Sequence, residues 1–177
     1  MFKIKKTKFD GLLIIVGKKY DDKRGFLREV LIEKLIKKKF IFHITSKSKK
    51  NVLRGLHLQY KKPQGKYISV IKGKVFDAAV DLRIKSKTFG QTFTITLSEQ
   101  NCTSVYIPEG FAHGFVTLGK ENIILYSCTD YRSEESECSL NWKDKDLNIS
   151  WPVKNALMSK KDKNAKSLSQ LKKKLFT

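Results

Sequence analysis

A succession of short apolar segments separated by turn residues constrains the fold of this chain more than any other feature. Each segment is rich in β-branched or aromatic residues and is bounded by Gly, Pro, Asn, Asp, Ser or Lys, a pattern typical of β-strands. The predicted strands span residues 26–30, 40–44, 52–58, 67–71, 75–82, 93–97, 104–107, 111–117 and 123–128. Many short strands at this spacing predict an all-β sandwich or barrel, and a length of 177 residues fits one domain.

The segment 75–82 alternates in polarity along its length. Its even-numbered residues are apolar, whereas Asp77, Ala79 and Asp81 occupy the other face. That second face therefore carries two carboxylates. It either lines a polar cavity inside the barrel or forms an ordinary solvated outer face, and the pattern alone leaves both open.

The composition of the sequence changes after Trp151 and Pro152, where lysines are frequent and apolar residues are sparse. Leu168, Leu171 and Leu175 are spaced to share one face of a short helix. We therefore expect a single domain over residues 1–177, in which residues 153–177 form a C-terminal helical extension.

Composition and charge narrow the classes of function. No apolar run approaches the roughly 18 residues that cross a bilayer, and the apolar stretch 12–16 is too short for a signal peptide, so we expect a cytoplasmic protein without membrane association. Cys102, Cys128 and Cys138 form no CxxC pair, which predicts reduced thiols and no zinc knuckle. The net charge of +20 favours a polyanionic partner, but scattered lysines without arginine forks argue against nucleic acid.

Two segments that contain histidine indicate one kind of barrel. Residues 108–113 read P-E-G-F-A-H, which is the P-x-G-x-x-H pattern seen in the second half of cupin barrels. In the first half, metal-binding cupins offer two histidines one residue apart, whereas this chain has His57 followed by Gln59. Glutamine is a poor substitute for imidazole as a ligand of transition metals. The sequence therefore predicts a cupin that holds no metal.

Further motifs occur in one order along nearly the whole chain, at residues 22–26, 52–57, 64–66, 76–83, 88–91, 107–115, 128–131 and 151–152. On these motifs the chain closely resembles the dTDP-4-dehydrorhamnose 3,5-epimerase family. The resemblance implies an all-β cupin jelly-roll barrel with a short C-terminal helical appendage. It also implies a homodimer with exchanged amino-terminal strands and shared active sites, and no cofactor. The implied reaction is epimerisation at C3 and/or C5 of a nucleotide-linked 4-keto sugar, such as a 6-deoxy sugar used for surface polysaccharides.

The same resemblance implies four catalytic residues. His57 is the general base and Asp162 orients it, because a carboxylate on the second ring nitrogen fixes the tautomer and stabilises the imidazolium. Lys66 lies near the C4 oxygen of the sugar, where a fixed cation stabilises the enolate more than the ketone. Tyr126 lies on the far side of the ring and delivers a proton to the opposite face.

Residues that bind or support the substrate are implied in the same way. Arg54 matches a diphosphate-binding arginine, which suits a bidentate fork. A flat strand would put Arg54 and His57 on opposite faces, so we expect a bulge or twist at Gly55 if both reach one pocket. His113 and Asp81 are expected in the pocket as supporting groups.

Recognition of the nucleotide leaves the most alternatives. Tyr20, Arg24 and Glu29 match positions that reach across the dimer to the partner's nucleotide, and Tyr131 matches a tyrosine near the base. Where the family usually shows Q-x-N-x-S, residues 42–46 read F-H-I-T-S, so GDP and a heptose stay open beside thymidine and the rhamnose precursor. A GDP-4-keto-heptose C3 or C3/C5 epimerase is thus one alternative, and a non-enzymatic cupin binding module is another.

Overall fold

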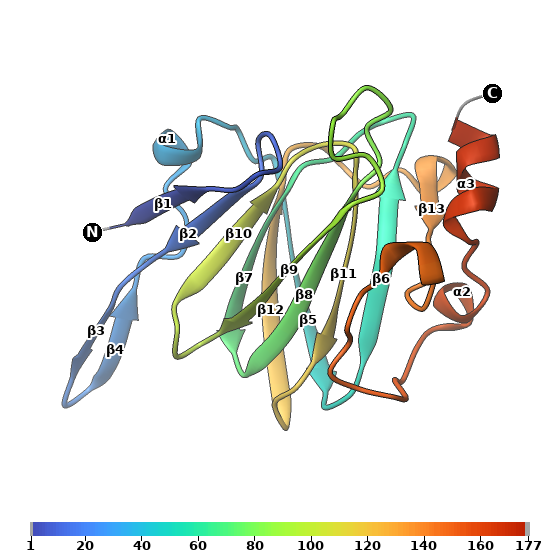
Figure 1. Ribbon diagram of the computed structural model, residues 1–177. Coiled ribbons are helices and arrows are strands. Elements are labelled where there is room, and N and C mark those ends of the chain that lie inside the picture. Colours follow the sequence, from blue (N-terminus) through green and yellow to red (C-terminus); the bar gives the residue numbers. More distant parts are fainter. Residues whose placement is uncertain (1, 176–177) are drawn as a thin grey trace.

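Two antiparallel sheets face each other in the computed structural model, which describes residues 2–175 and their side chains through Lys173 (Figure 1). The six-stranded sheet contains, in spatial order, β1 (Lys3–Lys6), β2 (Leu13–Val16), β10 (Thr103–Ile107), β7 (Lys66–Lys72), β12 (Glu121–Cys128) and β5 (Phe42–Lys49). The five-stranded sheet contains β13 (Glu137–Ser139), β6 (Leu53–Gln59), β11 (Phe111–Thr117), β8 (Lys74–Asp81) and β9 (Thr92–Ser98). The predicted all-β cupin jelly roll is confirmed.

All the strands expected from the sequence are present, but the pattern missed four others. The missed strands are β1, β2, β13 and β3 (Lys19–Asp22). Each of the four has at most one buried residue. β1, for instance, is exposed at every position, so burial imposes no apolar pattern on it. The strand expected at residues 40–44 instead runs from Phe42 to Lys49 and pairs with β12 over its whole length. The prediction ended too early because the second half of the strand is polar and carries no apolar signal.

The core lies between the sheets and contains apolar residues from both. Its buried members include Ile68 and Val70 of β7, Val75 and Ala79 of β8, Val105, Phe115 and Ile124. Asp77 and Asp81 share the inward face of β8 with these residues and are fully buried. The two-carboxylate face therefore points into the barrel and not into solvent, but neither carboxylate lines the 430 Å³ cavity described below.

The C-terminal segment covers the outer face of the five-stranded sheet. It contains α2 (Lys160–Lys163) and α3 (Leu168–Leu175), and α3 stands beside β6 and β13 in Figure 1. Leu168 and Leu171 are buried against Ala78 and Val80 of β8, and burial of one leucine contributes about 2 kcal/mol. The predicted terminal helix is confirmed, although the side chain of Leu175 lies outside the described residues.

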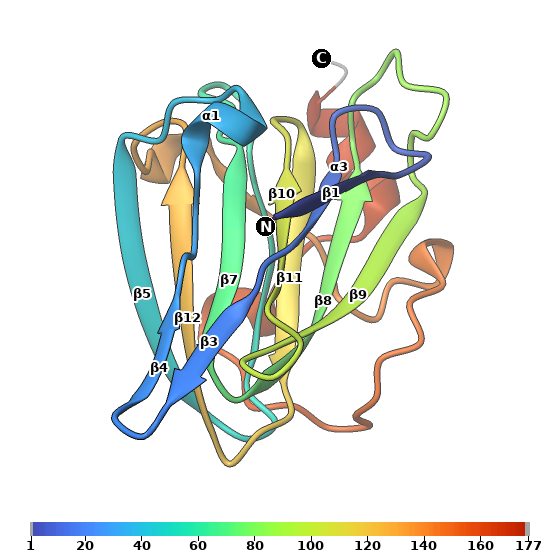
Figure 2. The ribbon, with the colours of Figure 1, turned by 90° about the vertical axis from the view of Figure 1, so that its left-hand side faces the viewer.

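A hairpin formed by β3 and β4 (Gly25–Arg28) projects from the body of the molecule (Figures 1 and 2). Its apolar residues are exposed, with Phe26 at 50% and Leu27 at 65%. Arg28 anchors the base of the hairpin, because its guanidinium donates to the Val70 carbonyl and the Ser69 hydroxyl of β7, each at 3.0 Å. The hairpin therefore offers an apolar surface that the rest of this chain does not cover.

The remaining sequence expectations concern thiols and membranes. Cys102, Cys128 and Cys138 are buried free thiols, as predicted. Within residues 2–175, no helix is both long enough and apolar enough to cross a membrane.

Candidate active site

A cavity of about 430 Å³ is formed by strands of both sheets and by the C-terminal segment. It brings together five of the residues expected there: Arg54, His57, Lys66, Tyr126 and Asp162. The other residues that line it are Phe42, Ile44, Thr45, Ser46, Leu58, Gln59, Gln64, Cys128, Arg132, Glu137, Ser159 and Lys161. A base, two cations and a phenol therefore share one enclosed space.

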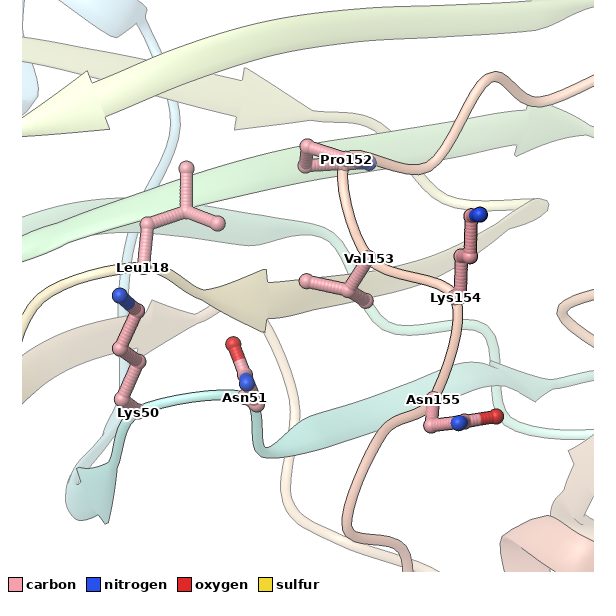
Figure 3. Close-up of a pocket in the computed structure, with 7 residues that line it drawn as sticks. All are labelled: Lys50, Asn51, Leu118, Pro152, Val153, Lys154 and Asn155. Carbon is pink, nitrogen blue, oxygen red and sulfur yellow. The ribbon is translucent and has the colours of Figure 1, made fainter.

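A larger cavity, of about 550 Å³, lies elsewhere on the molecule and has a different lining (Figure 3). Lys50 and Asn51 lie across from Lys154 and Asn155, with apolar side chains between them. The lining includes no carboxylate and no imidazole, so this cavity lacks the groups that general acid–base chemistry requires.

His57 and Asp162 form a close ionisable pair in the 430 Å³ cavity. His57 Nε2 on β6 lies 2.6 Å from Oδ1 of Asp162, which α2 presents behind its N-cap Ser159. Burial would raise the pKa of Asp162, but hydrogen bonds from His57, Ser159 and the Gly55 backbone outweigh it and leave the pKa below its usual value. The carboxylate is therefore ionised at neutral pH and leaves Nδ1 of His57 for proton transfer.

The bulge expected at Gly55 is present. The register between β6 and β11 shifts between His113 and Phe115, so Arg54 and His57 reach the same cavity despite their odd spacing. Gly55 has a φ of +119°, and a Cβ there would lie 2.5 Å from the Gly114 Cα. Only glycine fits this close approach without displacing β11.

Lys66 and Tyr126 supply a cation and a neutral acid on the opposite sheet. They lie on neighbouring strands, with Lys66 paired to Cys128 and Tyr126 two residues earlier on β12. Burial lowers the pKa of Lys66, and the nearby Cys128, Glu137 and Asp77 oppose this effect. Burial raises the pKa of Tyr126 despite its 3.2 Å contact with the Ser46 hydroxyl, so the phenol stays protonated at neutral pH.

Two predicted substrate-binding residues, Arg54 and Tyr131, lie in or beside the cavity. Arg54 Nε donates to the Ser48 hydroxyl at 3.1 Å, which fixes the direction of an exposed guanidinium that lines the cavity. Tyr131 is 61% exposed, and its ring centroid lies 5.8 Å from that of Phe42, another lining residue. The aromatic pair therefore stands at the edge of the cavity.

The expectation that Asp81 and His113 line the pocket is wrong for both residues. The Asp81 carboxylate instead accepts hydrogen bonds from Arg83, Ser86 and Thr88; burial opposes its ionisation, but these bonds lower its pKa to about 2. It therefore stabilises the turn after β8. His113 is buried and pairs with His57 in the ladder, but it does not line the cavity.

The carboxylate that pairs with His113 is Asp77, which was not among the expected site residues. His113 Nε2 lies 2.8 Å from Asp77 Oδ2, and both side chains are buried. Asp77 and Asp81 share one face of β8, so the alternating pattern could not decide between them. The register of β8 against β11 pairs His113 with Ala79, midway between the two carboxylates, so only the side-chain contact shows that the histidine meets Asp77.

The hairpin residues lie apart from the cavity of their own chain. Tyr20, Arg24 and Glu29 are exposed, and the Arg24 guanidinium pairs with Asp22 at the tip of the hairpin. Their role across a dimer stays a prediction, since it requires a second chain.

Three charged residues of the cavity were missed by sequence reasoning. Glu137 Oε2 accepts from Arg132 at 3.1 Å and from Lys161. Burial would raise the pKa of Glu137, but these two cations lower it to about 2. Two cations around one carboxylate leave an excess positive charge that suits an anionic ligand. The only signal in the sequence was the position of Lys161 next to Asp162.

The next feature is the set of side chains that could bind a metal ion. Across residues 2–175 no three His, Cys, Asp or Glu side chains gather where they could share an ion. Gln59, at the position of the second cupin histidine, uses its amide in hydrogen bonds to the backbone of Lys62, Tyr131 and Ser133. Independence from metal stays a prediction that chelation tests.

Asp162→Asn tests the role of the pair. We expect kcat/KM to fall by about 10- to 100-fold, part of the roughly 10²–10⁴ that general-base catalysis contributes, because the imidazole loses its orientation and its counter-charge. The pair also affects stability. The pKa of Asp162 is lower in the folded than in the unfolded protein, so the ionised pair stabilises the fold at pH values above the unfolded pKa of about 3.9, and this stabilisation is lost as pH falls through the folded pKa. In Asp162→Asn, acid unfolding followed by circular dichroism should no longer show this pH-dependent part of the free energy of unfolding. Unchanged turnover would show that the carboxylate has no catalytic part.

Comparison with known proteins identifies one family throughout. The sequence profile of the dTDP-4-dehydrorhamnose 3,5-epimerase family matches residues 6–170. The dTDP-4-dehydrorhamnose 3,5-epimerase of Methanothermobacter thermautotrophicus is 41% identical over 96% of each chain, and that of Salmonella typhimurium is 45% identical over 93% of this chain and 94% of its own. The crystal structure of the Legionella pneumophila 3,5-epimerase in complex with dTDP-4-keto-L-rhamnose superposes with a TM-score of 0.93, at 42% identity over 99% of this chain and 97% of that one.

Proposed function

The chain belongs to the dTDP-4-dehydrorhamnose 3,5-epimerase family and is an isomerase, and from this premise we propose that it inverts C3 and/or C5 of a dTDP-linked 4-keto-6-deoxy sugar. The observation that carries the proposal is the placement of the His57–Asp162 pair in one cavity with Lys66 and Tyr126. A base, an oxyanion partner and an acid are the three groups that epimerisation beside a ketone requires.

The first step is removal of the hydrogen on the carbon next to the C4 ketone. His57 takes the proton, and the electron pair of the C–H bond forms a carbon–carbon double bond while the C4 oxygen becomes an enolate. Lys66 lies on the facing sheet, and its ammonium stabilises that oxygen more strongly than it stabilises the ketone. The carboxylate of Asp162 stabilises the imidazolium formed at the same time.

The second step returns a proton to the opposite face of the ring. Tyr126 is protonated at neutral pH because burial raises its pKa, so its hydroxyl can donate to the carbanion. Transfer leaves a tyrosinate and an imidazolium, and exchange of one proton with solvent restores both groups. The net result is inversion without oxidation or reduction.

The nucleotide end of the substrate fits the cationic part of the cavity. Arg54, Arg132 and Lys161 supply donors for a diphosphate, and Tyr131 offers an exposed ring for the base. Phe42 and Ile44 add apolar surface where amide side chains were expected from the family. This favours testing a GDP-linked 4-keto-heptose as the second candidate substrate.

Solvent deuterium exchange on a panel of sugar nucleotides tests the proposal. The panel contains the dTDP-linked 4-keto-6-deoxy hexose, the GDP-linked 4-keto-heptose and a dTDP-sugar without a ketone, each with and without a chelator. We expect mass spectrometry and NMR to show deuterium at C3 or C5 of a keto sugar only, unaffected by chelation. A non-enzymatic binding module would exchange none of them, and exchange that requires added metal would exclude the proposed mechanism. The use of the product for surface polysaccharides and the cytoplasmic location stay predictions.

We further propose a homodimer in which the β3–β4 hairpin of one protomer completes the site of its partner. Support comes from the exposed Phe26 and Leu27 of the hairpin and from the distance of Arg24 from the cavity of its own chain. Mixing an inactive Arg24→Ala variant with an inactive His57→Asn variant should restore up to about a quarter of the wild-type sites by random subunit exchange. Mass spectrometry confirms that mixed dimers form. Mixed dimers without recovered turnover would exclude a shared site.

A further inference from the structure

The amide of Gln59 is fully occupied by the backbone around it. The residue is 4% exposed and lines the cavity. Its Nε2 donates to the carbonyls of Lys62 at 2.9 Å and Tyr131 at 3.3 Å, and its Oε1 accepts from the Ser133 amide at 2.9 Å. Both hydrogens and one lone pair are therefore used, and two of the three bonds go to the segment 131–133.

That segment needs such support because no strand holds it. Residues 129–133 lie between the end of β12 and the short 3-10 helix Glu134–Ser136, outside any sheet ladder. A second glutamine contributes from the same side, since Gln64 Nε2 donates to the Asp130 carbonyl at 2.6 Å. Two side-chain amides thus replace the backbone pairing that a strand would supply.

The segment carries two groups that face the ligand space. Arg132 lines the cavity beside Glu137, and Tyr131 forms the aromatic pair with Phe42 at its edge. Gln59 bonds to the backbone on both sides of Arg132, so the position of this pair of side chains depends directly on its amide.

We propose that Gln59 is a positioning residue that holds Tyr131 and Arg132 in the conformation that binds the nucleotide part of the substrate. The amide stands at the position of the second metal-binding histidine of other cupins. In this chain the residue at that position holds the segment 131–133 instead of a metal. The inference rests on the proposed function for the identity of the ligand. It predicts an effect on binding and not on proton transfer, because both amide hydrogens and one lone pair of the Gln59 oxygen are bonded to the backbone and the side chain is not an acid or a base.

Gln59→Glu and Gln59→Met test the inference. Glutamate keeps the acceptor but sets a carboxylate oxygen against two carbonyls, whereas methionine keeps the shape and removes all three bonds. We expect KM to rise by about 10-fold or more while kcat changes by less than about 3-fold, the signature of lost uniform binding. Calorimetry with dTDP alone should show a similar loss of affinity. Gln91→Glu is the matched control, because among the described contacts the side chain of Gln91 bonds only to the exposed Lys8.

A double-mutant cycle with Tyr131→Ala separates positioning from a general loss of stability. If Gln59 acts through the loop, the loss of affinity for dTDP in the double variant should be clearly less than the product of the two single losses, because the part that acts through Tyr131 is already gone, whereas independent effects would multiply. Independent effects, an unchanged KM or an equal effect of Gln91→Glu would overturn the proposal. Should the Gln59 variants fail to fold, Gln64→Met removes the neighbouring anchor at Asp130 and must raise KM in the same way. Binding of dTDP is measured without turnover, so a failure of the proposed reaction would leave this result readable.

Discussion

His57→Asn should lower deuterium exchange at every sugar carbon by about 10³-fold or more, while the fold and the affinity for dTDP stay close to wild type. Each enolate begins with loss of a proton to the imidazole, and asparagine has no basic nitrogen. Asparagine can still donate to Asp162, so the buried carboxylate keeps a partner. Exchange is measured by mass spectrometry at saturating substrate, and circular dichroism verifies the fold.

His43→Asn is the matched control for this experiment. His43 lies on β5, is exposed, and contacts the Ser127 hydroxyl at 3.0 Å without lining the cavity. The same substitution there should leave exchange unchanged. Near-wild-type exchange in a folded His57→Asn protein would exclude His57 as the base, and an equal loss in the His43→Asn protein would point to an indirect effect.

The fold was predictable because its strongest signal is local. Strands such as β8 and β11 are recognisable from the composition of a few consecutive residues. The alternation of β8 also defined the face that carries Asp77 and Asp81. Strands without a buried face, such as β1, carry no such signal. The helix α3 was predictable for the same reason as β8, since Leu168 and Leu171 repeat at helical spacing and are buried.

The site was predictable only where a motif or the family resemblance named its residues. Asp162 is 105 positions from His57 in the sequence, and a surface lysine-rich segment gives no reason to place it beside an imidazole. The choice of Asp81 over Asp77 failed because both lie on the same strand face, each two residues from Ala79, which is paired with His113. The side-chain contacts decide, since Asp81 bonds to Arg83, Ser86 and Thr88 whereas Asp77 meets His113. Such tertiary contacts are not encoded in composition.

The contacts of Gln59 show what the sequence could not predict about the site. The sequence predicted that this residue is not a metal ligand but gave no positive reason for an amide. The reason is a loop 72 positions away whose carbonyl it binds. Glu137 was missed in the same way, because its partners Arg132 and Lys161 come from two different segments.

Tyr126→Phe should separate exchange from inversion. Removal of a proton by His57 and its return to the same face regenerate the substrate, so inversion requires an acid on the other side of the ring. Phenylalanine keeps the packing of the ring against Phe115, at 6.2 Å between centroids, but removes the hydroxyl that contacts Ser46. Deuterium should therefore still enter C3 or C5, while formation of the epimer falls by about 10²-fold or more, within the range for loss of a general acid.

The comparison needs a control for the loss of a buried phenol. Tyr67→Phe removes a hydroxyl that donates to the Val30 carbonyl at 2.7 Å, outside the cavity, and should cost about 1 kcal/mol of stability without changing either rate. NMR follows deuterium entry and epimer formation in one sample, so their ratio does not depend on the amount of active enzyme. If Tyr126→Phe lowers both rates equally, the tyrosine serves binding or enolisation. If it lowers neither, water or another group is the acid. A ratio shifted toward exchange is the only result that the two-faced mechanism allows, because the base and the enolate partner remain in place when the acid is removed.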